Sequence, residues 1–231
     1  MTAVNPKNIY SICINCCGLI GDTLIRTPFI EAIKKKCPHA TIDIITDVDK
    51  TTLLENHPDV DKIITFNRNK KPTLKYLKDL LTVIKIIRKA HYDLMINLYG
   101  GGSSPQITKI SRAKHRWGFY YKKKHKSIYT YGCKNINTNT SLSHWGQALG
   151  VILKPFNIEP KNLRRGTTFI PTEDARQKAN TILKTANKSW VLFNMGAGDA
   201  RKMWPVKSYL QIAKWLQLTY DYRVLPVSMF S

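Results

Sequence analysis

Acidic residues and long apolar runs are both scarce in this 231-residue sequence, and the lack of long apolar runs excludes a membrane-spanning protein. No run of about 18 or more apolar residues occurs, so the sequence predicts no segment that spans a membrane. The first eight residues are polar and lack the apolar core of a signal peptide, which indicates a cytoplasmic protein. The hydrophobic fraction of 43% and the aromatic fraction of 10% are those of a globular domain rather than a disordered chain.

The shortage of acidic residues leaves a large positive charge. Asp and Glu total 15 against 37 Lys and Arg, for a formal net charge of +22. Such an excess favours a polyanionic partner: nucleic acid, an anionic lipid surface or a phosphorylated glycolipid. A generally basic proteome is the alternative explanation.

The five cysteines form no regular framework. Cys13 and Cys16 have the spacing of a redox or metal-binding pair, but no second pair of Cys or His follows at the distance of a zinc finger. Structural zinc requires four ligands, so we expect reduced, partly buried thiols and no metal site.

Apolar runs alternate with helical patterns, which predicts parallel βαβ units. The predicted strands of the first part are Tyr10–Asn15, Thr41–Thr46, Lys62–Phe66, Tyr92–Leu98 and Arg116–Phe119, with helices over Leu24–Lys36, Thr51–Asn56 and Leu74–Lys89. Pro28 is expected to offset or kink the first helix. The apolar stripe of the third is expected to consist of Leu77, Leu80, Leu81, Ile84 and Ile87. The basic, turn-rich stretch Tyr120–Asn139 is expected to form a loop.

Composition divides the chain into three parts. Residues 1–154 are predicted to form a Rossmann-like domain, and residues 155–171, rich in Pro, Asn, Arg and Gly, a linker. Residues 172–231 begin a second βαβ-like unit, with a strand at Trp190–Asn194, a helix at Trp204–Leu218 and a strand at Arg223–Val227. A domain usually needs on the order of 100 residues, so this second domain is expected to be incomplete.

The turn after the first strand is the most informative stretch. Gly18 and Gly21 permit a sharp turn, and Asp22 follows where ligands bind above the strand ends of an open α/β sheet. Asp22 is therefore a candidate general base, although a simple helix cap, worth ~1 kcal/mol, is the competing interpretation. The turn lacks the G-x-G-x-x-G pattern of nicotinamide-binding domains, and that function is set aside.

Five blocks recur in the order and spacing of a known family. They are Gly18-x-x-Gly21-Asp22 with Thr27-Pro28, His57-Pro58-Asp59-Val60-Asp61, Tyr92–Leu98, Ala113–Phe119, and Gly196-Ala197-Gly198 followed by Lys202-Met203-Trp204-Pro205. On these blocks the chain resembles glycosyltransferase family 9, the lipopolysaccharide heptosyltransferases. The resemblance implies a GT-B fold, in which the first Rossmann-like domain holds the acceptor and the second holds the sugar nucleotide.

The resemblance implies roles for individual residues. Asp22 would be the catalytic base of an inverting transfer, and Gly196, Ala197, Gly198 and Lys202 would bind the phosphates of an ADP-heptose-like donor. A solvated surface lysine is the alternative for Lys202. The resembled family is independent of metals, so Asp47-Val48-Asp49 and Asp59-Val60-Asp61 are not expected to hold an ion, and no cofactor is expected.

Glycines and basic residues are expected to serve an anionic glycolipid acceptor at the inner leaflet, which would make the protein peripheral at the membrane. These candidates are Gly18, Gly21, Gly101, Arg68, Lys70, Lys71, Lys122 and Lys123.

Two further functions stay open. The incomplete second domain favours a non-catalytic remnant that binds a glycolipid or a partner. The charge of +22 would suit nucleic acid, but the sequence contains no ordered recognition motif, so no specific nucleic acid is expected.

Overall fold

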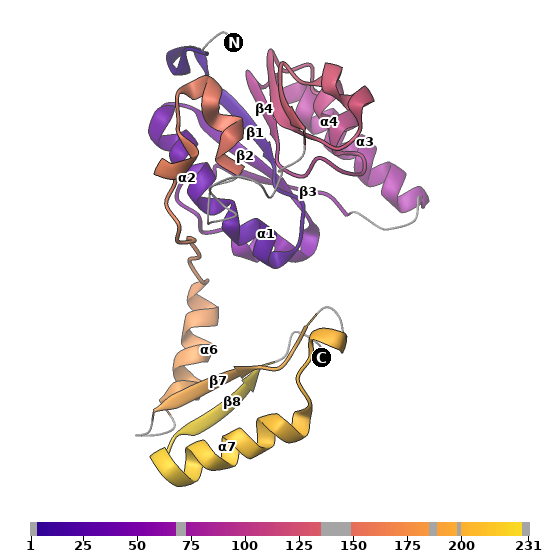
Figure 1. Ribbon diagram of the computed structural model, residues 1–231. Helices are drawn as coiled ribbons and strands as arrows, with labels where there is room; N and C mark the ends of the chain where they lie inside the picture. Colours follow the sequence, from indigo (N-terminus) through magenta and orange to yellow (C-terminus); the bar gives the residue numbers. More distant parts are fainter. Residues whose placement is uncertain (1–3, 68–72, 135–148, 185–188, 198–199, 228–231) are drawn as a thin grey trace. The chain divides into compact units, whose positions relative to one another are not determined.

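The computed structural model describes residues 4–67, 73–134, 149–184, 189–197 and 200–227 of the chain. Arg68, Lys70, Lys71 and Gly198, which the sequence suggested as binding residues, lie outside these ranges. The chain forms two compact units, Met1–Pro171 and Thr172–Ser231. The colours of Figure 1 follow the chain through both units.

A parallel sheet of six strands, in the order β3-β2-β1-β4-β5-β6, forms the centre of the first unit. The strands are β1 (Ser11–Asn15), β2 (Thr41–Thr46), β3 (Lys62–Thr65), β4 (Leu94–Asn97), β5 (His115–Tyr120) and β6 (Tyr131–Lys134). Because β1 pairs with both β2 and β4, the strand order reverses between β1 and β4. In open α/β sheets ligands bind at such a switch point, beyond the carboxyl ends of the strands.

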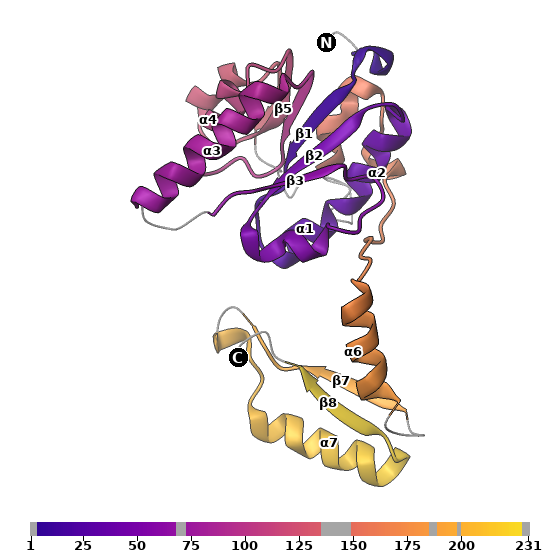
Figure 2. The ribbon, with the colours of Figure 1, turned by 180° about the vertical axis from the view of Figure 1, so that it is seen from behind.

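Helices cover both faces of this sheet (Figures 1 and 2). The α-helices of the first unit are α1 (Ile20–Ile25), α2 (Thr27–Lys36), α3 (Leu74–Ala90) and α4 (Ser104–Ile110). Its 3₁₀ turns are η1 (Pro6–Asn8), η2 (Val48–Leu53), η3 (Lys123–Ile128), η4 (Gly150–Phe156) and η5 (Pro160–Asn162).

The residues of β1 alternate between two cores. Ile12 and Ile14 pack into the cluster that contains Phe29 of α2, and Cys13 packs into the cluster that contains Ile87 of α3. A parallel sheet buried on both faces needs apolar residues at successive positions, so its strands appear in the sequence as unbroken apolar runs.

The expected break near Pro28 is confirmed, two residues before the proline. Arg26 separates α1 from α2, and Pro28 occupies the first turn of α2, where its missing N–H costs no hydrogen bond. The helix thus begins at Ile20 rather than Leu24.

The predicted apolar stripe of α3 is partly wrong. Leu77 is 48% exposed and Leu81 is 64% exposed, whereas Val83 and Ile87 are buried. Periodicity identified the helix, but two apolar stripes run along it, and the sequence does not say which one meets the sheet.

Two segments expected to be irregular are ordered parts of the first unit. The predicted loop Tyr120–Asn139 contains β6, which pairs with β5. The segment 155–171, expected as a linker, packs on the first unit: Phe156 is 1% exposed, with its ring 4.6 Å from that of Trp117, and Leu163 is 4% exposed. Proline and glycine suggested a linker, but these buried side chains hold the segment in the core.

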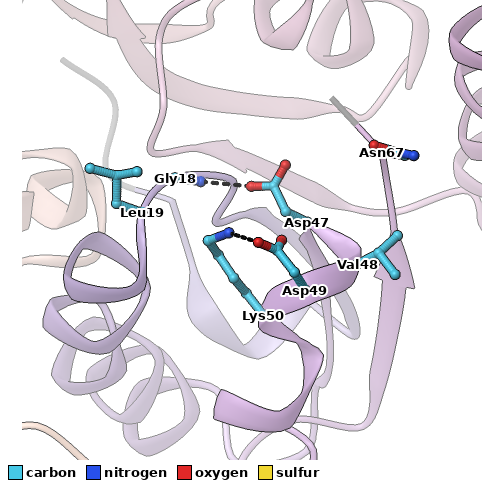
Figure 3. Close-up of a pocket in the computed structure, with 7 residues that line it drawn as sticks. All are labelled: Gly18, Leu19, Asp47, Val48, Asp49, Lys50 and Asn67. Atoms are coloured by element: carbon cyan, nitrogen blue, oxygen red, sulfur yellow. Dashed lines mark hydrogen bonds and ion pairs between the residues drawn. The ribbon is translucent and has the colours of Figure 1, made fainter. Parts of the chain in front are cut away.

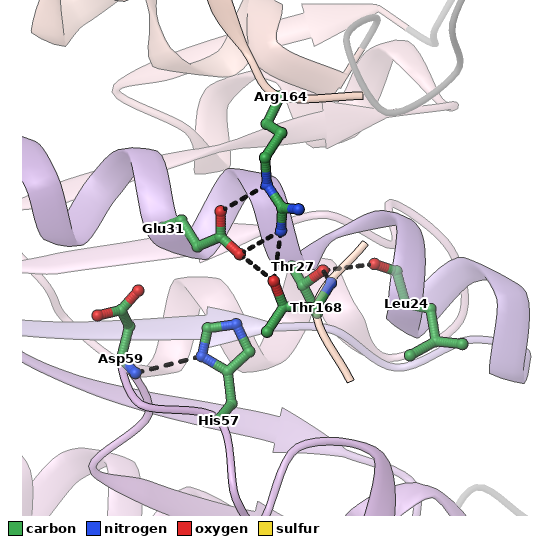
Figure 4. A network of polar contacts seen from close by, with 7 residues as sticks. All are labelled: Leu24, Thr27, Glu31, His57, Asp59, Arg164 and Thr168. Atoms are coloured by element: carbon green, nitrogen blue, oxygen red, sulfur yellow. Dashed lines mark hydrogen bonds and ion pairs between the residues drawn. The ribbon is translucent and has the colours of Figure 1, made fainter. Parts of the chain in front are cut away.

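Polar contacts attach the end of that segment to α2, as Figure 4 shows. Arg164 donates hydrogen bonds of 3.1 and 2.7 Å to the two carboxylate oxygens of Glu31, and the backbone N–H of Thr168 donates to Oγ1 of Thr27 at 2.8 Å. Partial burial opposes ionisation of Glu31, but the hydrogen bonds from Arg164 and Thr168 outweigh it and lower the pKa of the carboxyl.

The second unit consists of α6 (Glu173–Leu183), β7 (Trp190–Asn194), η6 (Ala200–Lys202), α7 (Val206–Tyr220) and β8 (Arg223–Val227). The strands β7 and β8 are parallel, as a βαβ unit requires. No residue described between 172 and 227 is buried.

Candidate active site at the carboxyl edge of the first sheet

Helix α1, which follows the turn after β1, carries Asp22 at the carboxyl edge of the sheet, next to the switch point. The backbone N–H of Leu19 donates a hydrogen bond to Oδ2 of Asp22 at 3.0 Å, so Asp22 sits at the third position of α1 and reaches back to the N-cap. The side chain is half-buried, and the described residues offer no hydrogen-bond donor to Oδ1. Asp22 therefore caps the helix through Oδ2, while its Oδ1 accepts no hydrogen bond from a described residue.

The two glycines of the turn differ in what they require. A Cβ at Gly18 would lie 2.9 Å from Cβ of Asp22 and 3.0 Å from Nη1 of Arg26, so a side chain there would displace the carboxylate. Gly21 lies in α1, and a Cβ added there would meet nothing within 4 Å. The expectation that the turn needs both glycines is therefore wrong for Gly21.

Arg26 joins the strand ends on both sides of the switch point. Its Nη1 donates to the carbonyl oxygens of Cys16 and Cys17 at 2.6 and 2.9 Å, and its Nη2 donates to that of Leu98 at 3.2 Å. The side chain is buried, with 5% of the residue exposed. These carbonyl groups directly follow β1 and β4, so the guanidinium links the carboxyl ends of the two strands.

Two asparagines in register shape the neighbouring turns. Asn15 and Asn97 are paired residues of β1 and β4. Oδ1 of Asn15 accepts from the N–H of Cys17 at 3.2 Å, and Oδ1 of Asn97 accepts from the N–H groups of Tyr99 and Gly100 at 3.1 and 3.3 Å. Each side chain thus bends the chain away from the sheet where its strand ends.

The glycine-rich turn after β4 uses glycine for backbone conformation. Gly100 and Gly102 have φ angles of 70° and 57°, in the left-handed region that glycine favours. A Cβ at Gly100 would also lie 3.0 Å from the ring of Tyr121. Gly101, the predicted acceptor residue, lies between them and is half-buried at the same edge as Asp22.

A pocket of about 470 Å³ opens beside Gly18, across the ends of β1, β2 and β3 (Figure 3). Its lining residues are Gly18, Leu19, Asp47, Val48, Asp49, Lys50 and Asn67. Oδ2 of Asp47 accepts from the N–H of Gly18 at 3.1 Å, and Nζ of Lys50 pairs with Asp49 at 2.6 Å. Carboxylate, ammonium and amide groups around one hollow are suited to hydrogen-bonding the hydroxyl groups of a sugar.

The same contacts argue against a phosphate at this turn. Helix N-termini bind phosphate through free backbone N–H groups. The N–H groups of Gly18 and Leu19 already donate to the carboxylates of Asp47 and Asp22. In this turn, two of the N–H groups that a phosphate site would leave free are therefore already bonded to carboxylates.

Sequence reasoning missed Arg26, Lys50 and Asn67, and it treated Asp47 as half of a possible metal motif. Asp47 follows β2, and Asn67 follows β3, so knowledge of the strand order would have placed both beside Gly18. Arg26 carries no local signal, because its partner Leu98 lies 72 positions away. The described residues contain no group of three or more His, Cys, Asp or Glu arranged to hold a metal ion.

The basic candidates of the first unit follow β5. Lys122 precedes η3 and Lys123 begins it, and both side chains are exposed. Because β4 lies between β1 and β5, these lysines are at the same sheet edge as Asp22 but two strands away. In the part of the chain that the structure describes, no helix combines the length and hydropathy of a bilayer span.

The donor candidates lie in the second unit. Gly196 and Ala197 follow β7, and the N–H of Gly196 donates to Oδ1 of Asn194 at 3.4 Å. Lys202 ends η6 and is exposed. Pro205 is the N-cap of α7, so this helix begins at Val206, two residues later than predicted.

Most of the thiols are buried, which disfavours the reactive thiolate form. All five cysteines are free, and four of them are buried. Burial raises the pKa of Cys16 to about 11, so its thiol stays protonated at neutral pH.

Comparison with known proteins shows which proteins this chain resembles in sequence and in fold. No protein-family model matches the chain. Lipopolysaccharide heptosyltransferase 3 of Escherichia coli K12 is 33% identical over 78 residues, which are 34% of this chain and 23% of that protein. The crystal structure of a family 9 glycosyl transferase from Veillonella parvula superposes with a TM-score of 0.83 at 19% identity, over 97% of this chain and 63% of the other.

The chain has the fold of a solved family 9 glycosyltransferase, and 78 of its residues resemble a heptosyltransferase in sequence. The Escherichia coli heptosyltransferase WaaC with ADP, another solved relative, has a TM-score of 0.63 at 14% identity, over 94% of this chain and 66% of that one. The expected resemblance to family 9 and the expected GT-B-like α/β fold are thus confirmed. The chain spans less than two thirds of the length of each of these relatives.

Proposed function

We propose that this chain acts in lipopolysaccharide synthesis as an inverting glycosyltransferase, which moves heptose or a related sugar from an ADP-sugar to a lipopolysaccharide core acceptor. The observation that carries the proposal is the position of Asp22. Its carboxylate lies at the switch point of the sheet, in one turn with Gly18, which lines the polar pocket. The relationship to the heptosyltransferases supplies the class of donor.

In the proposed reaction Asp22 removes the proton from the attacking hydroxyl of the acceptor. The oxygen forms a bond to the anomeric carbon from the side opposite the diphosphate, the bond from that carbon to the phosphate oxygen breaks, and the diphosphate leaves with the electron pair. General base catalysis of this kind contributes about 10²- to 10⁴-fold to a rate. Protonated Asp22 then returns its proton to water.

The acceptor sugar would occupy the pocket beside Gly18, where Asp47, Lys50 and Asn67 offer polar groups to its hydroxyls. Gly21 and Gly101 would let the acceptor approach the backbone. Lys122, Lys123, Arg68, Lys70 and Lys71 would attract the anionic parts of the glycolipid. A lipid-linked acceptor requires the protein to work at the cytoplasmic surface of the inner membrane, as a peripheral protein.

On the donor side, the nucleotide diphosphate would bind at the turn after β7. Gly196, Ala197 and Gly198 would bring backbone N–H groups close to the phosphates, and Lys202 would stabilise the charge that develops on the leaving group. No metal and no further cofactor takes part in this proposal.

A direct test is to incubate the purified chain with an ADP-heptose and a deacylated core acceptor and to determine the anomeric configuration of the product. A product of inverted configuration, formed in proportion to the ADP released, is the expected result. Retention of configuration, or ADP release that does not depend on the acceptor, would contradict the proposal.

The second candidate function is a binding module that holds the glycolipid or a partner without turnover. It is favoured by the second unit, in which no described residue between 172 and 227 is buried. Saturable binding of the deacylated acceptor without any release of ADP would support this function over catalysis.

A further inference from the structure

Helix α3 carries an apolar stripe that the first unit leaves in solvent. Leu74, Leu77 and Leu81 are 81%, 48% and 64% exposed. The opposite side of the helix holds Val83 and Ile87, which are buried in the core. The helix is therefore anchored on the sheet by one stripe and presents a second one outward.

The exposed leucines form a continuous line. Their spacing of three and four residues places them on one face, along about 10 Å of the helix. An isolated exposed leucine is ordinary, but three in line on a helix that is already docked need a separate explanation.

The charges beside this line are positive. Lys78 and Lys85 lie next to the leucines on the helix surface and are exposed, and neither forms an ion pair with a described residue. The single acidic residue of α3, Asp79, lies nearer the core-facing side by its position in the helical repeat. Apolar residues bordered by lysines are the pattern of a helix that lies in the surface of an anionic membrane.

The topology places this face beside the candidate active site. Because α3 follows β3, its first turns lie at the carboxyl edge of the sheet, the edge that also carries Asp22 and the pocket. Figures 1 and 2 show these first turns extending beyond the sheet. A surface bound by Leu74 and Leu77 would lie on the side of the unit where an acceptor enters.

We propose that the outer face of α3, defined by Leu74, Leu77, Leu81, Lys78 and Lys85, docks on an anionic lipid surface. The purpose of this docking, delivery of a lipid-linked acceptor to Asp22, rests on the proposed function. The apolar residues would enter the boundary between head groups and acyl chains, while the lysines bind the head groups. Exposed apolar residues of α7 are no equivalent site, because no residue of that helix is buried to hold it in place.

The test is sedimentation of the full chain with vesicles of phosphatidylglycerol and phosphatidylethanolamine, compared with vesicles of phosphatidylcholine. We expect binding to the anionic vesicles, and a loss of about tenfold or more for the double variant Leu77→Gln with Leu81→Gln. Replacement of Lys78 and Lys85 by Gln should weaken binding about fivefold per lysine and reduce its dependence on salt.

The matched control is Leu210→Gln with Leu218→Gln on α7, two leucines that are 57% and 87% exposed. This control should bind vesicles as the unchanged chain does. The proposal would be overturned if the α3 and α7 double variants lost vesicle binding equally, or if the α3 double variant lost none. The proposal would also be overturned if the chain formed a dimer without lipid and only the α3 double variant abolished that dimer. The outer face of α3 would then bind a second copy of the chain.

The docking proposal and the proposed function can fail separately. Vesicle binding is measured without donor or acceptor, so it does not depend on catalysis. Conversely, transfer to a deacylated, water-soluble acceptor needs no membrane, and the α3 variants should leave its rate unchanged. Lowered transfer to the soluble acceptor would show that the α3 face acts in the active site, which would contradict a docking role.

Discussion

The backbone N–H of Leu19 donates a hydrogen bond to Oδ2 of Asp22 at 3.0 Å. This contact closes the first turn of α1 and fixes the direction of the carboxylate at the end of β1. One side chain thus has a structural and a proposed chemical role, and the two can be separated because each uses a different oxygen.

Asp22→Asn should strongly slow transfer while preserving the fold. The amide oxygen of Asn can still accept from Leu19, but the side chain can no longer take a proton, so the rate should fall about 10²- to 10⁴-fold. ADP release in the presence of the deacylated acceptor measures the loss, and thermal unfolding checks the fold. Asp174→Asn, on exposed α6, should leave the rate unchanged. A rate within a factor of two of the original for Asp22→Asn would remove Asp22 from the mechanism.

Gly18→Ala and Gly21→Ala form a matched pair within one turn. The first introduces a Cβ 2.9 Å from Cβ of Asp22 and should disturb the carboxylate, lowering transfer. The second adds a methyl group in open space inside α1 and should raise the free energy of unfolding by up to about 1 kcal/mol, because Ala favours helix more than Gly. Kinetics and chemical denaturation of both variants test this contrast. Equal changes of the free energy of unfolding in the two variants would show that the steric argument for Gly18 is mistaken.

Arg26→Met should destabilise the first unit. The substitution leaves the buried carbonyl oxygens of Cys16, Cys17 and Leu98 without their donor, and we expect the free energy of unfolding to fall by about 3 kcal/mol. Chemical denaturation gives this value. Arg165→Met, an exposed position, should change it by less than about 0.5 kcal/mol. A neutral Arg26→Met would mean that the strand ends hold together without the guanidinium.

Lys202→Gln should weaken donor binding. Loss of a charged partner of the diphosphate should reduce the affinity for ADP about tenfold, measured by isothermal titration. Lys207→Gln, on exposed α7, serves as the control and should bind ADP normally. If both variants bind equally well, Lys202 is a solvated surface residue.

His57 should make stability depend on pH. Burial lowers the pKa of its imidazole, and its Nδ1 accepts from the N–H of Asp59 at 3.2 Å (Figure 4). The unfolded state therefore binds a proton more readily than the folded state. The contribution of neutral His57 to the free energy of unfolding is complete above the unfolded pKa of about 6.5 and is lost as the pH falls below that value. His57→Asn should remove this part of the decrease, as denaturation at several pH values can measure, whereas His39→Asn, at an exposed position, should not. A wild-type curve that matches the His57→Asn curve throughout would contradict the prediction.

The sequence predicted the elements on which the candidate site is built, because each leaves a local signal. Parallel strands buried on both faces appear as apolar runs, and β2 was predicted to the residue. The position of Asp22 followed from a strand, a glycine and a helix in succession. The prediction of the buried face was wrong for α3, because the apolar residues of this helix form two stripes and either could have packed on the sheet.

By itself, the sequence determined the order of strands and helices, the resemblance to family 9 and the turn that carries Asp22, since all three depend on neighbouring residues. Tertiary structure decided which face of α3 is buried. It also decided that Asp47 accepts a hydrogen bond from the N–H of Gly18, and that Arg164 binds Glu31, 133 positions away in the sequence. Such contacts form when the sheet brings strand ends together. These contacts stabilise only the folded chain, and their partners lie too far apart in the sequence to leave a local pattern.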